Sequence, residues 1–307
     1  MFYRAKTKLR KHYFNYACRK ILDTPPIGAK TGGPVILSEV SNSDVIMYLV
    51  AAKSLYRSLG QGRIVLLLDR DCPEKNLGIF EEHVRPWKII RVEDQVSDRC
   101  PRGGTWERIL TIAQLVESDY VIQVDSDTVT KGPVPDVVGC VRTGCSFMIG
   151  TWKRQEIEPV TVSAERVKNS LSHHVQILGE QRLTDLDGAE FLRYARGQSS
   201  FAGFARGSFS LERLEAFSER MEALLGKEKW AQWGSESFAS NFWVANADKA
   251  VVLPWPKYAS YNPERGMDFD ASSFLHFEGT NRFKHGVYVK TGSSVAAELS
   301  PRNFRDR

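Results

Sequence analysis

Apolar and polar positions along the first half of the chain predict strands and helices in regular succession. Short continuous apolar runs, typical of strands buried on both faces, occur at 35–37, 64–68, 87–92 and 120–124. Between them, apolar residues recur at helical spacing over 45–59, 73–84 and about 105–116. The resulting order β-α-β-α-β-α-β is that of a parallel sheet covered by helices.

The pattern of the second half is less regular. It predicts strands at 146–149, 201–204, 251–253 and 274–277, and helices at 211–225 and about 235–246. We expect these strands to continue the sheet of the first half. The sequence therefore predicts an α/β fold with a mixed, mainly parallel central sheet flanked by helices, in a single domain of two halves.

Composition agrees with a folded enzyme-sized domain. The 307 residues are 42% apolar, which is enough for a full hydrophobic core, and 26% charged, which is near the globular average. The five cysteines, at 18, 72, 100, 140 and 145, form no C-x-x-C pair and no zinc-ligand spacing. Such a set is typical of a reducing compartment, so we expect a cytoplasmic protein. We read no membrane span and no secretion signal.

The net charge of +5 is unevenly distributed. Residues 1–30 contain eight Lys or Arg and one Asp, a net +7, so the rest of the chain sums to −2. Aromatic and aliphatic residues are interleaved with these cations, and residues 1–33 are predicted to be a basic amphipathic extension. Two interpretations are open: peripheral contact with an anionic membrane at its inner face, or a helix packed on the body with solvated charges. The slightly acidic body argues against a nucleic-acid partner.

The segment Tyr-Val-Ile-Gln-Val-Asp-Ser-Asp-Thr-Val, residues 120–129, places two carboxylates directly after a predicted buried strand. Ligands of α/β sheets gather at the carboxyl ends of strands, and the following turn can bring Asp125 and Asp127 toward one point. Two hard oxygen ligands near one point suit Mg²⁺ or Mn²⁺. The structural alternative is that Asp125 caps a turn and Asp127 is solvated. The apolar strand before the pair favours the metal.

Phosphate-binding glycine loops are absent, because the chain contains neither G-x-G-x-x-G nor G-x-x-x-x-G-K-[ST]. A nucleotide diphosphate bound at this sheet would therefore need a metal ion to neutralise it.

A second cluster, Phe-Leu-His-Phe-Glu-Gly-Thr-Asn-Arg-Phe-Lys-His-Gly, occupies residues 274–286. His276 follows an apolar run, where an imidazole can be the third ligand of Mn²⁺. A lone His in such a place is more often structural. However, Gly279 would let the backbone approach a phosphate, and Arg282 and Lys284 would supply positive charge to a leaving diphosphate. The gathering of these residue types within nine positions favours a functional site.

Three stretches, in this order, resemble the glycosyltransferases of the GT-A fold, and within them the retaining family-eight enzymes, relatives of glycogenin and of bacterial lipopolysaccharide galactosyltransferases. They are Tyr-Leu-Val-Ala-Ala-Lys-Ser-Leu at 48–55, Asp-X-Asp at 125–127 and His-X-X-Gly at 276–279. The resemblance implies a GT-A domain (Rossmann-like) over 34–290. Its nucleotide-sugar-binding half would be 34–135 and its acceptor half 136–290, followed by a tail at 291–307.

The resemblance also implies metal and donor contacts. Asp127 and His276 would bind the metal directly, and Asp125 would bind both the metal and the donor ribose. Ser38 and Glu39, after the first strand, would lie near the base of the nucleotide.

Further roles are implied around the diphosphate and the sugar. Ser126 would also contact the nucleotide sugar. Arg108 is similar in placement to a cation that steadies the diphosphate, and a solvated helix face is its alternative. The family's Asp-Gln segment matches Ser235–Glu236, so Glu236 is a candidate nucleophile for a retaining reaction; its alternative is a surface charge at a helix start. The family's Lys at the sixth position after the His is here Arg282, a forked guanidinium instead of an ammonium.

We therefore expect an enzyme: a metal-dependent glycosyltransferase of hexosyltransferase type that moves a sugar from a UDP-sugar to a glycan or glycolipid, with Mn²⁺ or Mg²⁺ as cofactor. Asp125, Asp127 and Glu236 are its predicted catalytic residues. Two alternatives stay open, a nucleotidyltransferase acting on a sugar phosphate and a non-catalytic sugar-binding module. The first would usually need a glycine-rich loop after the first strand, whereas Gly32 and Gly33 precede it; the intact ligand set argues against the second.

Overall fold

The computed structural model describes residues 2–28, 31–266 and 268–300. The chain forms two compact units. The first unit comprises Met1–Ile90, Val124–Pro135 and Pro256–Arg307, and the second comprises Arg91–Gln123 and Asp136–Trp255. The second unit is thus inserted, in two pieces, into the sequence of the first.

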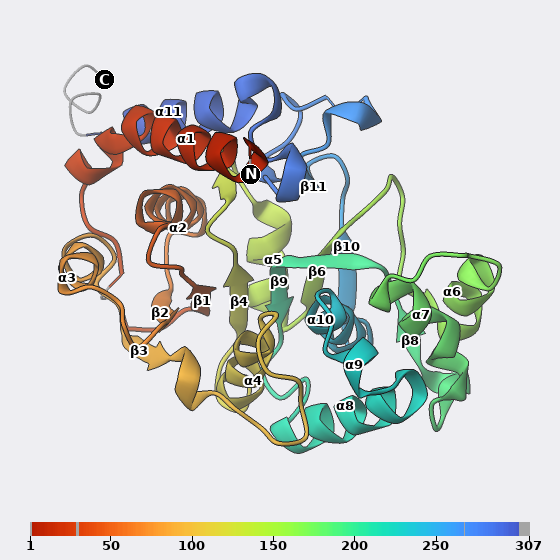
Figure 1. Cartoon of the computed structure of the whole chain (residues 1–307). Coiled ribbons are helices and arrows are strands. Elements are labelled where there is room, and N and C mark those ends of the chain that lie inside the picture. Colours follow the sequence, from red (N-terminus) through yellow and green to blue (C-terminus); the bar gives the residue numbers. More distant parts are fainter. Residues whose placement is uncertain (1, 29–30, 267, 301–307) are drawn as a thin grey trace. The chain divides into compact units, whose positions relative to one another are not determined.

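Seven strands form one sheet in the order β10-β6-β9-β4-β1-β2-β3 (Figure 1). Strand β1 pairs in parallel with β2, and β10 with β6, whereas β6 and β9 are antiparallel. Their bounds are β1 (Val35–Glu39), β2 (Arg63–Leu68), β3 (Lys88–Arg91), β4 (Val121–Val124), β6 (Ser146–Gly150), β9 (Gly197–Phe204) and β10 (Ala250–Leu253). The predicted α/β fold with a mixed, mainly parallel sheet flanked by helices is confirmed.

One predicted strand lies outside this sheet. Strand β12 (Phe274–His276) belongs to a separate three-stranded sheet, β11-β12-β5, in the first unit. It runs parallel to β11 (Tyr258–Ser260) and antiparallel to β5 (Thr128–Thr130). The expectation that 274–277 extends the central sheet was therefore wrong. Its partners β5 and β11 have three residues each, too few to show the two-residue period of a strand.

Most helices of the first unit lie where apolar periodicity predicts them, but the helix over Val287–Glu298, which covers part of the expected tail at 291–307, was not predicted. Helix α2 (Val45–Leu59) buries most of its residues and ends at Gly60, whose φ of +75° is the left-handed conformation that glycine adopts without strain. The others are α1 (Phe2–Ala17), α3 (Glu74–His83) and α11 (Val287–Glu298).

Helix α1 is packed on the body of the first unit. It lies beside α11 (Figure 1), where the Phe14 and Tyr288 rings are 4.1 Å apart and both are fully buried. Lys11 forms an ion pair with Asp44. The interpretation of the N-terminal segment as a packed helix is confirmed. Among the described residues, we find no helix whose length and apolarity would suffice to span a membrane.

The second unit has a core of stacked aromatic rings. Phe217 lies 4.3 Å from Phe242, in stacked orientation, and Trp230 meets Trp106 edge to face at 5.5 Å. The helices that carry or surround this core are α4 (Trp106–Leu115), α5 (Pro135–Thr143), α6 (Val160–Val167), α7 (Val175–Arg182), α8 (Leu211–Leu225), α9 (Lys227–Trp230) and α10 (Ser235–Ala245).

Helices α4, α8 and α10 match their predictions. Short α5, α6 and α7 escaped notice because so few turns define no clear apolar stripe. Strands β7 (Glu158–Pro159) and β8 (Arg193–Tyr194) form a two-stranded antiparallel pair.

Lys53 on α2 is a buried cation, with 1% of its surface exposed. Its ammonium group donates to the Thr24 carbonyl at 3.2 Å, to the Thr24 hydroxyl at 2.7 Å and to the Pro25 carbonyl at 3.0 Å. It also lies 3.1 Å from Nδ1 of His83. Burial lowers the pKa of Lys53 to about 8, against a smaller opposing effect of Glu82. The ammonium ties the segment after α1 to α2.

The lowered pKa of Lys53 predicts a specific pH dependence of stability. Between about pH 8 and the ordinary lysine value of 10.5, the unfolded chain binds more protons at this position than the folded chain. The contribution of Lys53 to the free energy of unfolding therefore increases as pH rises through this window. In urea denaturation, the stability of wild type relative to Lys53→Met should rise over the same window. The exposed Lys75→Met is the control, and an equal pH trend in both comparisons would contradict the prediction.

Candidate metal centre

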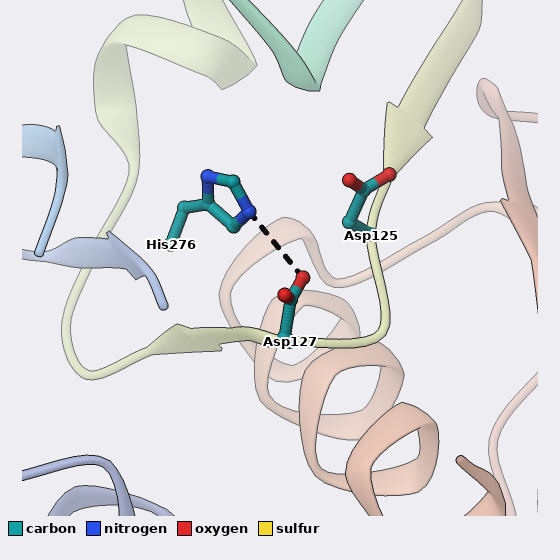
Figure 2. Close-up of side chains that lie close together, drawn as sticks. All are labelled: Asp125, Asp127 and His276. Atoms are coloured by element: carbon teal, nitrogen blue, oxygen red, sulfur yellow. Dashed lines mark ion pairs between the residues drawn. The ribbon is translucent and has the colours of Figure 1, made fainter. Parts of the chain in front are cut away.

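The pairing of two short strands brings Asp125, Asp127 and His276 together in the first unit. Asp125 directly follows β4, Asp127 directly precedes β5, and His276 ends β12. The antiparallel register places His276 opposite Thr128, and the Phe277 amide donates to the Asp127 carbonyl at 2.8 Å. Residues 150 positions apart in sequence are thus fixed by backbone hydrogen bonds. Figure 2 shows the three side chains turned toward a common space.

These three side chains fit one divalent cation. One ligand atom from each, two carboxylate oxygens and an imidazole nitrogen, lies within 4.8 Å of the others. Ligands on opposite sides of an octahedral ion with bonds of ~2.1 Å are about 4.2 Å apart, so only small side-chain movements separate this arrangement from a coordinated one. Two hard oxygens with one imidazole suit Mn²⁺, and also Mg²⁺. The sequence prediction that these residues converge is confirmed, and together they could hold a divalent metal ion.

Asp127 is the electrostatic centre of the group. It is 7% exposed and has a basic side chain beside each of its oxygens: Nε2 of His276 at 3.4 Å from Oδ1, and the Arg282 guanidinium paired with Oδ2. Burial alone would raise the pKa of Asp127, but the charges of His276 and Arg282 outweigh it and lower that pKa below its ordinary value. For His276, burial opposes the charged form, yet attraction to Asp127 raises its pKa. The carboxylate is therefore kept ionised, as a metal ligand must be.

Further contacts orient the ligands from behind, and no sequence pattern indicated them. The Ser260 hydroxyl, at the end of β11, lies 3.2 Å from Nδ1 of His276, which leaves Nε2 directed at Asp127. Nε of Arg282 donates to the Phe277 carbonyl at 3.0 Å, which fixes the guanidinium. Such outer contacts set the ring orientation and tautomer of a ligating histidine.

The other residues of the first unit that were predicted to contact the nucleotide sugar range from buried to exposed. The Ser38 hydroxyl is buried and donates to the Val124 carbonyl at 2.7 Å, so it joins β1 to the last residue of β4. Glu39 is half-buried at the end of β1. Gly279 has a φ of +50° and open space where a side chain would be. Lys284 pairs with Glu264 at 2.7 Å on the surface. The carbonyl of Ser126, between the two aspartates, lies 3.5 Å from the Tyr288 hydroxyl.

Arg108 and Glu236 form a buried ion pair in the second unit. Arg108 Nη2 is 3.0 Å from Oε2 of Glu236, and the side chains are only 6% and 2% exposed. The same oxygen accepts hydrogen bonds from the Ser199 hydroxyl at 3.0 Å and the Thr105 hydroxyl at 3.1 Å. The alternatives of a solvated helix face for Arg108 and a surface charge for Glu236 are therefore wrong, because both side chains are buried and paired.

Thr105 adds backbone strain to this cluster. Its φ of +72° is left-handed, which a β-branched residue adopts only when its surroundings hold it there. Such strain, of order 1–3 kcal/mol, is concentrated at functional sites.

The fold of this chain is similar to those of solved glycosyltransferase structures. No protein-family model and no curated protein sequence matches the chain. Among solved structures, the apo structure of the bifunctional glycosyltransferase WbbM aligns with 91% of this chain at 12% identity and a TM-score of 0.52. The galactosyltransferase LgtC, in complex with donor and acceptor sugar analogues, aligns with 88% at 11% identity and a TM-score of 0.51. The chain spans about half of WbbM (53%) but nearly all of LgtC (99%).

The chain thus has the GT-A fold of the glycosyltransferases, as its sequence led us to expect. Within that fold it carries an Asp-X-Asp and His group able to hold a metal ion at the carboxyl end of β4.

Replacing Asp127 by Asn should weaken metal binding while the fold is retained. The amide is uncharged and a poorer ligand, so we expect the affinity for Mn²⁺, measured by calorimetry, to fall at least roughly tenfold. The control is Asp71→Asn, because Asp71 is an exposed residue of a second Asp-X-Asp that also follows a strand. Circular dichroism checks folding. Equal Mn²⁺ affinities for wild type and Asp127→Asn would remove Asp127 from the ligand set.

Replacing Glu236 by Gln should destabilise the protein. The substitution leaves the buried Arg108 charge uncompensated, and breaking a buried ion pair in this way costs about 3–5 kcal/mol. Glu219→Gln is the matched control, since Glu219 pairs with Arg99 in the same unit but is 52% exposed, and its loss should be much smaller. Urea denaturation gives the comparison. If both variants lose equally little stability, the buried pair has no structural role.

Proposed function

We propose that this protein transfers a sugar from a UDP-sugar to a glycan or glycolipid acceptor, with retention, using Mn²⁺ or Mg²⁺ held by Asp125, Asp127 and His276. One observation carries the proposal: a chain with the glycosyltransferase fold gathers two carboxylates and an imidazole at the carboxyl end of β4, where ligands of such sheets bind. No Gly-rich phosphate loop competes for this role in the sequence.

The residues around the centre match the needs of a departing diphosphate. A bound divalent ion supplies the positive charge that neutralises this leaving group. Asp125 and Asp127 hold the ion, and Ser260 keeps Nε2 of His276 in position. Arg282 is fixed by the Phe277 carbonyl and brings a guanidinium to Asp127. A guanidinium in this place can donate charge-assisted hydrogen bonds to a phosphate oxygen.

The nucleotide contacts are assigned to residues of the first unit. Glu39 at the end of β1, together with Ser38 behind it, is assigned to the base, and Ser126 to the nucleotide sugar. Gly279 has room for a phosphate where a side chain would be. Lys284 would exchange its exposed partner Glu264 for a phosphate, at little cost, because surface ion pairs contribute at most about 1 kcal/mol.

Arg108 and Glu236 are assigned to the diphosphate and to the reacting sugar, respectively. Their mutual ion pair and the strained Thr105 support a built site in the second unit. To attack the anomeric carbon, the Glu236 carboxylate would need one lone pair free of its donors while the bond from that carbon to the leaving UDP breaks. The Glu236→Gln variant is measured in two ways, by its stability and by its turnover of donor. A loss of turnover in protein that remains folded favours the catalytic role.

The proposed function predicts that UDP binding depends on a divalent cation. Calorimetry with UDP should give clear binding with Mn²⁺ and at least roughly tenfold weaker binding with EDTA, because a cation held by Asp125, Asp127 and His276 would supply the positive charge that attracts the diphosphate. If EDTA leaves the affinity for UDP unchanged, UDP binding does not depend on a metal ion and the prediction is wrong.

Turnover of UDP-sugars tests the reaction itself. Hydrolysis of the donor should release UDP, and Asp127→Asn should slow it by at least ~10²-fold, the scale of losing one main electrostatic stabiliser. Asp71→Asn should leave the rate unchanged. Release of pyrophosphate from UTP and a sugar phosphate would instead identify a nucleotidyltransferase, and sugar binding without turnover would identify a binding module.

A further inference from the structure

The outer face of α1 presents an apolar stripe to solvent. Leu9, Tyr13 and Tyr16 are 70%, 62% and 64% exposed. Their spacing of four and three residues puts them on one line along the helix. The opposite face of the same helix is already used, because Phe14 is buried against Tyr288 of α11. The helix therefore has two apolar faces, one packed inside the protein and one directed outward.

Cations flank the outward stripe. Lys6 and Lys8 are exposed beside its N-terminal end, and Lys20 is exposed beyond its C-terminal end. The Arg19 guanidinium lies over the Tyr16 ring, 4.0 Å from its centroid. These residues belong to the segment 1–30 with a net charge of +7, whereas the remaining chain sums to −2. Four exposed cations, Lys6, Lys8, Arg19 and Lys20, therefore lie on or next to the helix that carries the stripe.

We propose that this face of α1 binds the surface of an anionic lipid bilayer, with the helix lying in the plane of the headgroups. Leu9 enters the acyl boundary, and the two tyrosines sit at headgroup level, where an apolar ring with a polar tip is favoured. The lysines interact with anionic headgroups. The helix is 16 residues long and strongly charged, which suits the interface and not the bilayer core.

Charge complementarity selects this partner over a second copy of the chain. A symmetric dimer through α1 would bring the same cationic face together twice, and the like charges would repel. An anionic bilayer attracts those charges and also accepts the apolar stripe. A nucleic acid would attract the charges but has no apolar interior for Leu9. Binding that depends on the apolar stripe therefore distinguishes a bilayer from a nucleic acid.

Surface substitutions test the proposal better than deletion. Removing residues before Gly28 would also remove Phe14, Cys18 and Ile21, which are fully buried, and so would damage the fold. The triple variant Leu9→Ser, Tyr13→Ser, Tyr16→Ser changes only exposed side chains. Its matched control, Leu171→Ser, Phe191→Ser, Trp233→Ser, changes three apolar residues of the second unit that are even more exposed.

The measurement is co-sedimentation of the full chain with phosphatidylserine-containing vesicles at low salt. We expect binding that falls as salt rises, that is weak on pure phosphatidylcholine, and that drops at least roughly tenfold in the α1 triple variant but not in its control. Replacing Lys6, Lys8 and Lys20 by Gln should weaken binding by roughly fivefold per cation in contact with the surface. The matched set at Lys75, Lys153 and Lys227 should have little effect.

Three results would overturn the proposal. They are equal binding to both vesicle types, full binding by the α1 triple variant, or tighter binding to RNA than to vesicles in a competition assay. Donor hydrolysis in solution is measured on the same proteins. Because the variants do not touch the metal centre, loss of membrane binding with unchanged hydrolysis separates this inference from the proposed function.

Discussion

The antiparallel pairing of β5 with β12 is the interaction on which the candidate site depends. It is short, with three residue pairs, but it joins the chain just after the central sheet strand β4 to a segment that follows only after the longer piece of the second unit, Asp136–Trp255. Backbone hydrogen bonds of this kind leave little freedom in register, because a slip by one residue turns each side chain to the opposite face. Asp127 and His276 therefore meet through strand geometry, and their approach does not rely on flexible loops.

Much of the fold was predictable because it follows from long apolar patterns. Helices α2, α4, α8 and α10 and the strands of the central sheet bury continuous or periodic apolar runs, and such patterns change little with tertiary context. The elements that escaped prediction are short. Strands β5 and β11 have no period to detect, and their existence depends on partners distant in sequence. Tertiary pairing alone makes them strands.

The residues of the candidate site also differ in how far the sequence could predict them. Asp125, Asp127 and His276 were predictable because each follows or ends an apolar strand, which places it at a sheet edge. The environment of Arg108 and Glu236 was not, since burial of an ion pair requires knowing that α4, β9 and α10 converge in the second unit. Ser260 could not be foreseen at all, because one serine in a polar loop carries no signal until β11 pairs with β12.

The Arg282–Asp127–His276 arrangement has a consequence for how the protein matures. A buried carboxylate with no counter-charge would destabilise the chain until an ion arrived, and folding would then wait for the metal. Here two side chains of the protein itself balance Asp127 on both oxygens. In the proposed metal site, folding and loading would therefore be separate events: the polypeptide completes its structure with internal charges, and an ion that enters later would exchange with them. If the group holds a divalent ion as proposed, the supply of cation, and not the moment of folding, would set the fraction of molecules that carry one.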